Sequence, residues 1–290
     1  MNKKGLIYII LASVLWGASG IFVHYLAPFG VTSLQMTFIR GFVSFICMLG
    51  YILVVDPKLI KTNTKELVMF LGSGISFFAT STCYYHSMQL TSISTAVVLM
   101  YTAPIFVMIY SVMFLGEKLT GLKLLSVAGM IVGCGFVSGI IGGLKFNALG
   151  IAIGFVSGIS YASYNIITKI EMQNGINPFK ANFYCFLFSI FVGLIIAKPY
   201  GIINCISINP PVVISLSVGV GLITCILPYF FYTLALREIP AGTASSLGIL
   251  EPMAATIFSV IIFKEQLSTF SVTGIILILG SVFLLSRESE

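Results

Sequence analysis

A glutamate followed by a proline interrupts an apolar stretch near the end of the sequence, SSLGILEPMAATIFS at residues 245–259. Burial of a carboxylate is costly, and a proline inside a helix removes one backbone hydrogen bond. Pro252 is expected to leave the Gly248 carbonyl without its amide donor, so that this carbonyl and the Glu251 carboxylate form an electronegative site. Such a site suits a substrate ammonium group or a coupling proton. Alternatively, Glu251 only fixes helix packing through hydrogen bonds to neighbouring helices.

One arginine has an equally unusual setting. Arg40 lies eight residues into an apolar stretch and Glu251 lies nine residues into another. At the helical rise, both side chains start roughly 12–14 Å deep in a hydrocarbon core of about 30 Å. Ionisable groups at this depth face the interior of a helix bundle or a wet cavity. Arg40 could bind a substrate carboxylate or satisfy backbone carbonyls, and the sequence leaves both interpretations open.

Aromatic side chains recur within the apolar stretches, and Trp16 is the only tryptophan. Their rings could stack on a substrate or hold a cation by their π faces, with ordinary interior packing as the alternative. The predicted substrate-binding residues are Glu251, Trp16, Tyr84, Tyr101, Tyr161, Asn165, Tyr232 and Arg40. Pro104, Pro228 and Pro252 are predicted to break helices beside the same cavity.

The composition indicates which elements position these residues. Of the 290 residues, 58% are hydrophobic and 8% are charged, whereas soluble domains are about 25% charged. Apolar runs of about 20 residues recur, each long enough to cross a bilayer as a helix. We therefore predict an all-α membrane protein with ten transmembrane helices. The predicted spans are 6–26, 32–55, 66–89, 94–114, 121–141, 148–169, 178–198, 211–236, 242–263 and 268–286.

Sequence motifs for several other chemistries are missing. There is no GxxxxGK[ST] loop for a nucleotide and no HExxH, and the six cysteines include no CxxC pair. Asp56 is the only aspartate, which excludes an aspartyl dyad for an intramembrane enzyme. No repeated ring of charge or filter-like loop indicates a channel. We expect no cofactor, no metal and no enzymatic activity.

The charge distribution predicts the orientation in the membrane. The net charge is +6, and eleven basic residues lie in the loops and tails of one side against three on the other. By the positive-inside rule, both termini are predicted to be cytoplasmic, in a multi-pass protein of the cell membrane. The charge therefore sets orientation, and we infer no nucleic acid partner from it.

The sequence contains an internal repeat. Residues 84–119 align without a gap to residues 232–267, which pairs Tyr84 with Tyr232 and Pro104 with Pro252. Each predicted repeat, 1–143 and 144–290, holds five spans, and an odd number forces the second copy through the membrane in the opposite sense. Many secondary transporters use such inverted repeats for alternating access around a midplane site.

Several motifs carry a resemblance to a known family. They are LWG at 15–17, YxxxM/L at 84–88 and 232–236, LEP at 250–252, and the GEKLT and KEQLS junctions at 116–120 and 264–268. Together with the paired prolines, they resemble the EamA family of the drug/metabolite transporter superfamily. The resemblance covers nearly the whole chain. It implies ten helices and the movement of small metabolites, often amino acids and commonly outward.

The expected function is secondary transport of a small polar metabolite, an amino acid or related zwitterion, in the direction of export. The alternative is a carrier of organic cations or quaternary amines, which the aromatic rings and Glu251 would enclose. Glu251 is also the candidate for proton coupling, because it is the sole carboxylate placed deep in a span. The other expected partners are the lipid bilayer and protons. Overlapping GxxxG patterns at Gly129, Gly133, Gly135 and Gly139 suit close packing within a monomer or in a homodimer.

Overall fold

The computed structural model describes residues 2–91, 93–138, 147–264, 266 and 268–287, and this part of the chain is helical without strands. Its α-helices are α1 (Lys3–Gly17), α2 (Ser19–Leu26), α3 (Ser33–Val55), α4 (Thr64–Leu90), α5 (Ile93–Met100), α6 (Ala103–Phe114), α7 (Gly121–Val137), α8 (Ala148–Gln173), α9 (Pro178–Ile196), α10 (Tyr200–Ile208), α11 (Pro210–Gly221), α12 (Leu227–Glu238), α13 (Ala241–Leu247), α14 (Leu250–Phe263) and α15 (Thr269–Arg287). Two 3-10 turns, η1 (Ala27–Phe29) and η2 (Pro57–Ile60), and a π-helical turn, η3 (Leu222–Ile226), lie between them.

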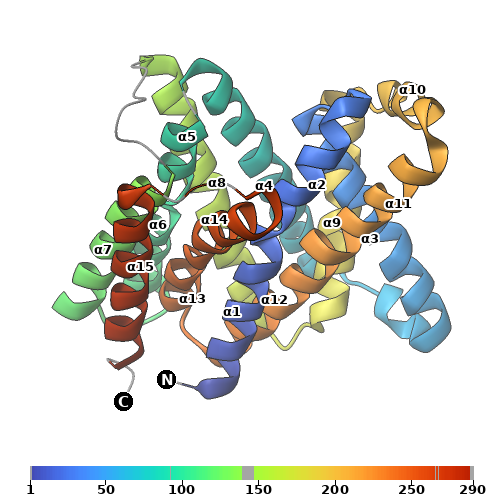
Figure 1. Cartoon of the computed structure of the whole chain (residues 1–290). Helices are drawn as coiled ribbons and strands as arrows, with labels where there is room; N and C mark the ends of the chain where they lie inside the picture. Colours follow the sequence, from blue (N-terminus) through green and yellow to red (C-terminus); the bar gives the residue numbers. More distant parts are fainter. Residues whose placement is uncertain (1, 92, 139–146, 265, 267, 288–290) are drawn as a thin grey trace.

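Eight helical segments are long and apolar enough to cross a membrane, and they coincide with the predicted spans 1 to 4 and 6 to 9. Two shorter apolar helices, α7 and most of α15, occupy the positions of predicted spans 5 and 10. The last residues predicted for span 5, 139–141, lie outside the described residues. Helix α10 was not predicted and lies between predicted spans 7 and 8. Helix α1 begins and α15 ends at the same end of the bundle (Figure 1).

Polar residues at the helix N-termini explain where several helices begin. At α3, the Gln35 amide donates to the Thr32 hydroxyl at 3.3 Å and the Thr32 amide donates to the Gln35 side chain at 3.0 Å, which forms a capping box. The side chains of Asn63 and Asn147 accept first-turn amides of α4 and α8 at 2.9 Å. Each such cap contributes about 1 kcal/mol.

Two of the membrane-length segments are broken near their middle, at places that correspond in the internal repeat. One break separates α5 from α6 just before Pro104, and the other separates α13 from α14 just before Pro252. Each proline lies in the first turn of the second helix, where its missing N–H is not needed. The expectation of a freed Gly248 carbonyl is wrong, because the Glu251 amide donates to that carbonyl at 3.0 Å. The turn of the chain at this break therefore gives the Gly248 carbonyl a donor, although Pro252 has no amide.

Several of the main helix contacts recur when each helix is replaced by its counterpart in the other half of the chain. Helix α4 packs along α8, and their counterparts in the other half, α12 and α1, also pack together. Helices α5 and α6 pack on α8, as α14 packs on α1. Helix α3 contacts α9, and α7 contacts α15; in each of these pairs the two helices are counterparts in the two halves. The cavity described below lies where these two sets of helices meet.

Helices α7 and α15 lie side by side (Figure 1), and their backbones approach closely at two glycines. A Cβ atom at Gly274 would lie 2.6 Å from the Gly133 carbonyl oxygen, and one at Gly133 would lie 2.8 Å from the Gly274 carbonyl oxygen. Glycine at both positions lets the backbones touch. This part of the predicted GxxxG pattern thus serves a contact within one chain.

Candidate functional site

A cavity of about 390 Å³ lies between the helices of the two halves, within the usual range of small-molecule sites, about 300–1,000 Å³. Its wall carries two charged side chains, Arg40 and Glu251. The aromatic residues on the wall are Trp16, Phe77, Tyr84, Tyr85, Tyr101, Tyr161, Tyr164 and Tyr229. A few hydroxyl groups and aromatic rings around two opposite charges suit a small polar ligand.

The cavity extends toward one end of the bundle. The lining residues Gly20, Val23 and Ser33, where α2 runs toward its end and α3 begins, are exposed. Trp16 and Tyr101 line the deeper part and are 3% and 2% exposed. The mouth therefore lies at the end opposite to the start of α1.

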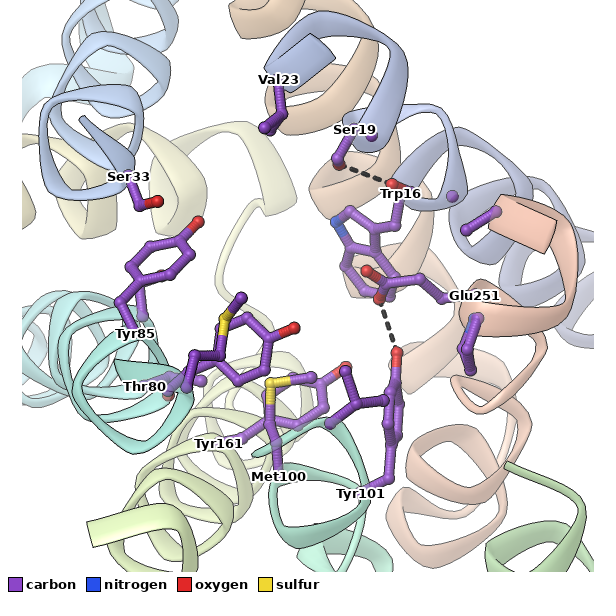
Figure 2. A pocket seen from close by; sticks show the side chains of 18 of the residues that line it. Trp16, Ser19, Val23, Ser33, Thr80, Tyr85, Met100, Tyr101, Tyr161 and Glu251 are labelled. Atoms are coloured by element: carbon purple, nitrogen blue, oxygen red, sulfur yellow. Dashed lines mark hydrogen bonds between the residues drawn. The ribbon is translucent and has the colours of Figure 1, made fainter. Parts of the chain in front are cut away.

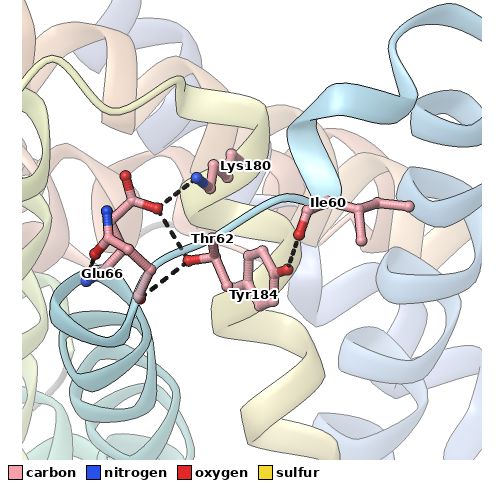
Figure 3. Close-up of polar contacts among 6 residues, drawn as sticks. Ile60, Thr62, Glu66, Lys180 and Tyr184 are labelled. Carbon is pink, nitrogen blue, oxygen red and sulfur yellow. Dashed lines mark hydrogen bonds and ion pairs between the residues drawn. The ribbon is translucent and has the colours of Figure 1, made fainter.

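Polar contacts close the other end of the bundle (Figure 3). Lys180, at the start of α9, forms an ion pair with Glu66, at the start of α4, with an Nζ–Oε2 distance of 2.5 Å. The Thr62 hydroxyl donates to Glu66 at 2.9 Å, and the Tyr184 hydroxyl donates to the Ile60 carbonyl at 2.5 Å. These bonds hold α4, α9 and η2 together.

Two further contacts at this end involve charged side chains. Lys169 Nζ on α8 donates to the carbonyls of Leu236 at 2.6 Å and Ile239 at 2.8 Å, at the C-terminus of α12. Glu117 accepts a hydrogen bond of 2.8 Å from the amide of Ala241, the first residue of α13. A cation at a helix C-terminus and an anion at an N-terminus both complement the helix dipoles.

Glu251 is held at the meeting point of the two helix breaks. It is the second residue of α14, so its carboxylate lies near the positive end of that helix. The hydroxyl of Tyr101, in the break between α5 and α6, donates to Glu251 Oε2 at 2.8 Å (Figure 2). A hydrogen bond to a charged group is worth about 1.5–3 kcal/mol. The carboxylate is thus positioned by residues from both halves.

Arg40 spans the gap between α3 and the π-helical turn η3. Its Nη2 atom donates to the Thr224 carbonyl at 2.7 Å, and its Nε atom has no hydrogen-bond partner among the described residues. In α-helical register the Thr224 carbonyl would accept the amide of residue 228, but Pro228 has none, and the chain forms the π-helical turn η3 here. Arg40 therefore supplies a donor where Pro228 has none, and the residue also lines the cavity.

Aromatic rings pack around the deep part of the cavity. The Trp16 ring lies edge-on to Tyr229, with centroids 5.1 Å apart, and tilted against Tyr232 at 5.3 Å. Trp16 Nε1 is buried without a hydrogen-bond partner among the described residues. Tyr229 also packs edge-on to Tyr164 and Phe77, at 5.6 and 5.1 Å.

The structure brings seven of the predicted residues to the cavity wall and leaves four behind it. Those on the wall are Trp16, Arg40, Tyr84, Tyr101, Tyr161, Glu251 and Pro252. Asn165 is buried and donates to the Ser245 hydroxyl at 3.1 Å, and Tyr232 is buried behind Trp16. Pro104 is buried in the first turn of α6, and Pro228 is buried in that of α12. These four act on the cavity only through their neighbours.

Several wall residues were missing from the predicted set. Tyr229 contacts Trp16, Phe77, Tyr164 and Phe186, at the centre of the aromatic cluster. Tyr229 lies four residues after Cys225 and three residues before Tyr232, so the three residues share one helix face. That spacing is the signal that could have identified it.

Together, the fold and the cavity define a multi-pass helical membrane protein with a polar, aromatic-lined site between two similar halves. Comparison with known proteins gives the family. The profile of the EamA-like transporter family matches residues 3–139 and again residues 148–287. The chain belongs to this family, and it is a membrane transporter.

Relatives of nearly equal length support this assignment. An uncharacterized transporter of Archaeoglobus fulgidus is 26% identical over 97% of this chain and 95% of its own length. Another, of Clostridium kluyveri, is 25% identical over 99% of this chain and 95% of its own length. A protein of known crystal structure shares the fold, with a TM-score of 0.80 over 99% of both chains at 14% identity.

Proposed function

We propose that the protein is a secondary transporter that moves a small polar metabolite, an amino acid or related zwitterion, out of the cell by alternating access. Two five-helix halves of inverted topology, residues 1–143 and 144–290, would rock around the cavity between them, with both termini in the cytoplasm. The main helix contacts that recur on exchange of the halves support this layout, as do the two matches to the family profile.

One observation carries the choice of substrate. Arg40 and Glu251 line the same cavity, and neither has an ion-pair partner among the described residues. Two opposite charges that share a cavity without neutralising one another suit a ligand that carries both charges. The guanidinium would bind a carboxylate and Glu251 would bind an ammonium group. The aromatic rings would enclose the side chain.

Carriage of an organic cation is the second candidate. Trp16, Tyr101 and Tyr161 line the cavity with Glu251, and their π faces could enclose a quaternary amine. The guanidinium of Arg40 in the same cavity opposes this reading, because it would repel a cation that has no carboxylate.

The closure of one end of the bundle also fits alternating access. The ion pair of Glu66 with Lys180 and the contacts of Lys169 lie at the end where α1 begins. With cytoplasmic termini, this conformation exposes the cavity to the outside, and a second one would open these contacts. Export would require that second conformation to load the substrate.

A binding panel on the purified protein tests the substrate class. Each L-amino acid is compared with its amide, which lacks the carboxylate, and with its N-acetyl derivative, which lacks the ammonium group. At least one zwitterion is expected to raise the unfolding temperature while both its derivatives do not. A response to the amides alone would establish the cation carrier and refute the zwitterion proposal.

A further inference from the structure

A second acidic residue is buried away from the cavity wall. Glu171 lies two residues before the end of α8, is 0% exposed, and has no hydrogen-bond partner for either carboxyl oxygen among the described residues. The sequence placed it outside the span, which was predicted to end at residue 169. Burial of an ionised carboxylate without a cation costs far more than burial of the same group with a proton bound, so burial favours the protonated carboxyl.

A row of polar side chains on α8 leads from the cavity to Glu171. Tyr164 lines the cavity, and Thr168 and Glu171 follow it at intervals of four and three residues, on the same face of the helix. Tyr164 and Thr168 are about one helical turn apart on this face. Both residues are 2% exposed, and their oxygens have no hydrogen-bond partner in the described part of the chain. The row spans about 10 Å along the helix axis.

The groups that face Glu171 are few. From α4 comes the Ser73 hydroxyl, which donates to the Phe70 carbonyl at 3.0 Å and lies beside the carboxyl. The Cys185 thiol on α9 and the Tyr164 hydroxyl on α8 interact electrostatically with Glu171. Neighbouring Lys169 is engaged with the C-terminus of α12, so it forms no ion pair with Glu171.

An aromatic pair on α4 and α9 lies close to the contacts of Figure 3 at the closed end. The rings of Phe70 and Tyr184 are stacked, with centroids 4.8 Å apart. Lys180 lies 5.9 Å from the Phe70 ring centre and forms the ion pair with Glu66. Opening of this cluster would connect Glu171 with the solution at that end.

We propose that Glu171 is a second proton-binding site and that the row Tyr164, Thr168 and Glu171 carries protons between the cavity and the closed end of the bundle. The inference rests on the proposed function, because a proton path serves a transporter that exchanges protons for substrate. A proton enters the cavity from outside, where Glu251 and the Tyr164 hydroxyl are the groups that can receive it, and it passes into the row at Tyr164. In each later transfer one O–H bond forms as the next one breaks, until the proton resides on Glu171. It leaves when the Phe70–Tyr184 cluster opens, while substrate moves outward.

The first experiment needs no substrate. Infrared spectra of the protein in lipid are recorded for the wild type and for Glu171→Gln, which keeps the side-chain shape. The wild type is expected to show the C=O stretch of a protonated carboxyl that the variant lacks. Tyr164→Phe should slow the deuterium-induced shift of that band severalfold, whereas Tyr51→Phe, outside the row, should leave it unchanged. An identical band in Glu171→Gln, or equal exchange in the two tyrosine variants, would overturn the proposal.

The second experiment measures transport in proteoliposomes with a radiolabelled mixture of L-amino acids. Glu171→Gln is expected to retain exchange across membranes without a pH gradient but to lose accumulation driven by a pH gradient. Accumulation equal to that of the wild type would refute the relay. Absence of any uptake by the wild type would instead refute the proposed amino acid substrate, and the infrared result would still decide the role of Glu171.

Discussion

Replacement of Arg40 by methionine is expected to destabilise the protein, and Pro228→Ala is expected to reverse most of that loss. Thr224 is 0% exposed, and its carbonyl accepts a hydrogen bond of 2.7 Å from Arg40. Arg40→Met leaves this buried carbonyl without a donor, at a cost of about 1–3 kcal/mol. For a chain of this size, the melting temperature is expected to fall by roughly 5 °C.

Pro228→Ala supplies the missing amide in the helical register that α12 has from Leu227 onward. The new N–H would point toward the Thr224 carbonyl and satisfy it without the guanidinium. Intrinsic fluorescence of Trp16, which packs against Tyr229 in the same region, reports the unfolding. A double variant that melts as low as Arg40→Met alone would refute the view that Arg40 completes the backbone of this helix.

The same double variant separates the two roles of Arg40. With the fold restored, the cavity still lacks its positive charge. Binding of a zwitterion should then weaken by about tenfold or more, because a charge-assisted hydrogen bond is lost. Unchanged affinity would show that Arg40 serves only the structure.

Three further outcomes are expected. In a double-mutant cycle of Tyr101→Phe and Glu251→Gln, the effects of the two substitutions on stability should be coupled by about 1 kcal/mol, because the two side chains share one hydrogen bond. Additive effects would contradict that bond. Gly274→Ala should destabilise the protein by about 1–3 kcal/mol in thermal unfolding, because the new Cβ atom would lie 2.6 Å from the Gly133 carbonyl oxygen. Gly280→Ala on the same helix is the control: its Cβ atom would have nothing within 4 Å, so this variant should be as stable as the wild type or more stable. Lys180→Met should speed alkylation of buried Cys185 severalfold, measured by mass spectrometry, and the charge exchange Glu66→Lys with Lys180→Glu should restore the slow rate if the ion pair closes this end.

Much of the architecture could be predicted from hydropathy and the internal repeat. Apolar runs of membrane length leave a helix as the main solution for the backbone, so eight membrane-length helices appear where they were predicted. Charged side chains in the middle of such runs are costly unless they face the bundle interior or a wet cavity, and a tryptophan there lies away from the interfacial positions that it usually occupies. On these grounds Arg40, Glu251 and Trp16 were predicted to bind the substrate, and all three line the cavity.

Other features depend on local geometry that the sequence does not encode simply. Proline alone indicates a helix break, but the partner of the Gly248 carbonyl depends on how the chain turns there. Asn165 and Tyr232 lie on helix faces that also carry cavity residues, but small differences in the rotation of each helix bury these two side chains behind the cavity wall. Glu171 was missed because hydropathy ended the span at residue 169, whereas α8 continues to Gln173 and tertiary packing buries its last turn.

The most direct test of the account is substrate counterflow in proteoliposomes, with the amino acid that the binding panel selects, for the wild type and for Glu251→Gln. The wild type should exchange the zwitterion, and the variant should lose at least tenfold in apparent affinity, because the neutral amide cannot pair with the ammonium group. Equal affinity of the two proteins would contradict the claim that the Glu251 carboxylate in this cavity binds the substrate.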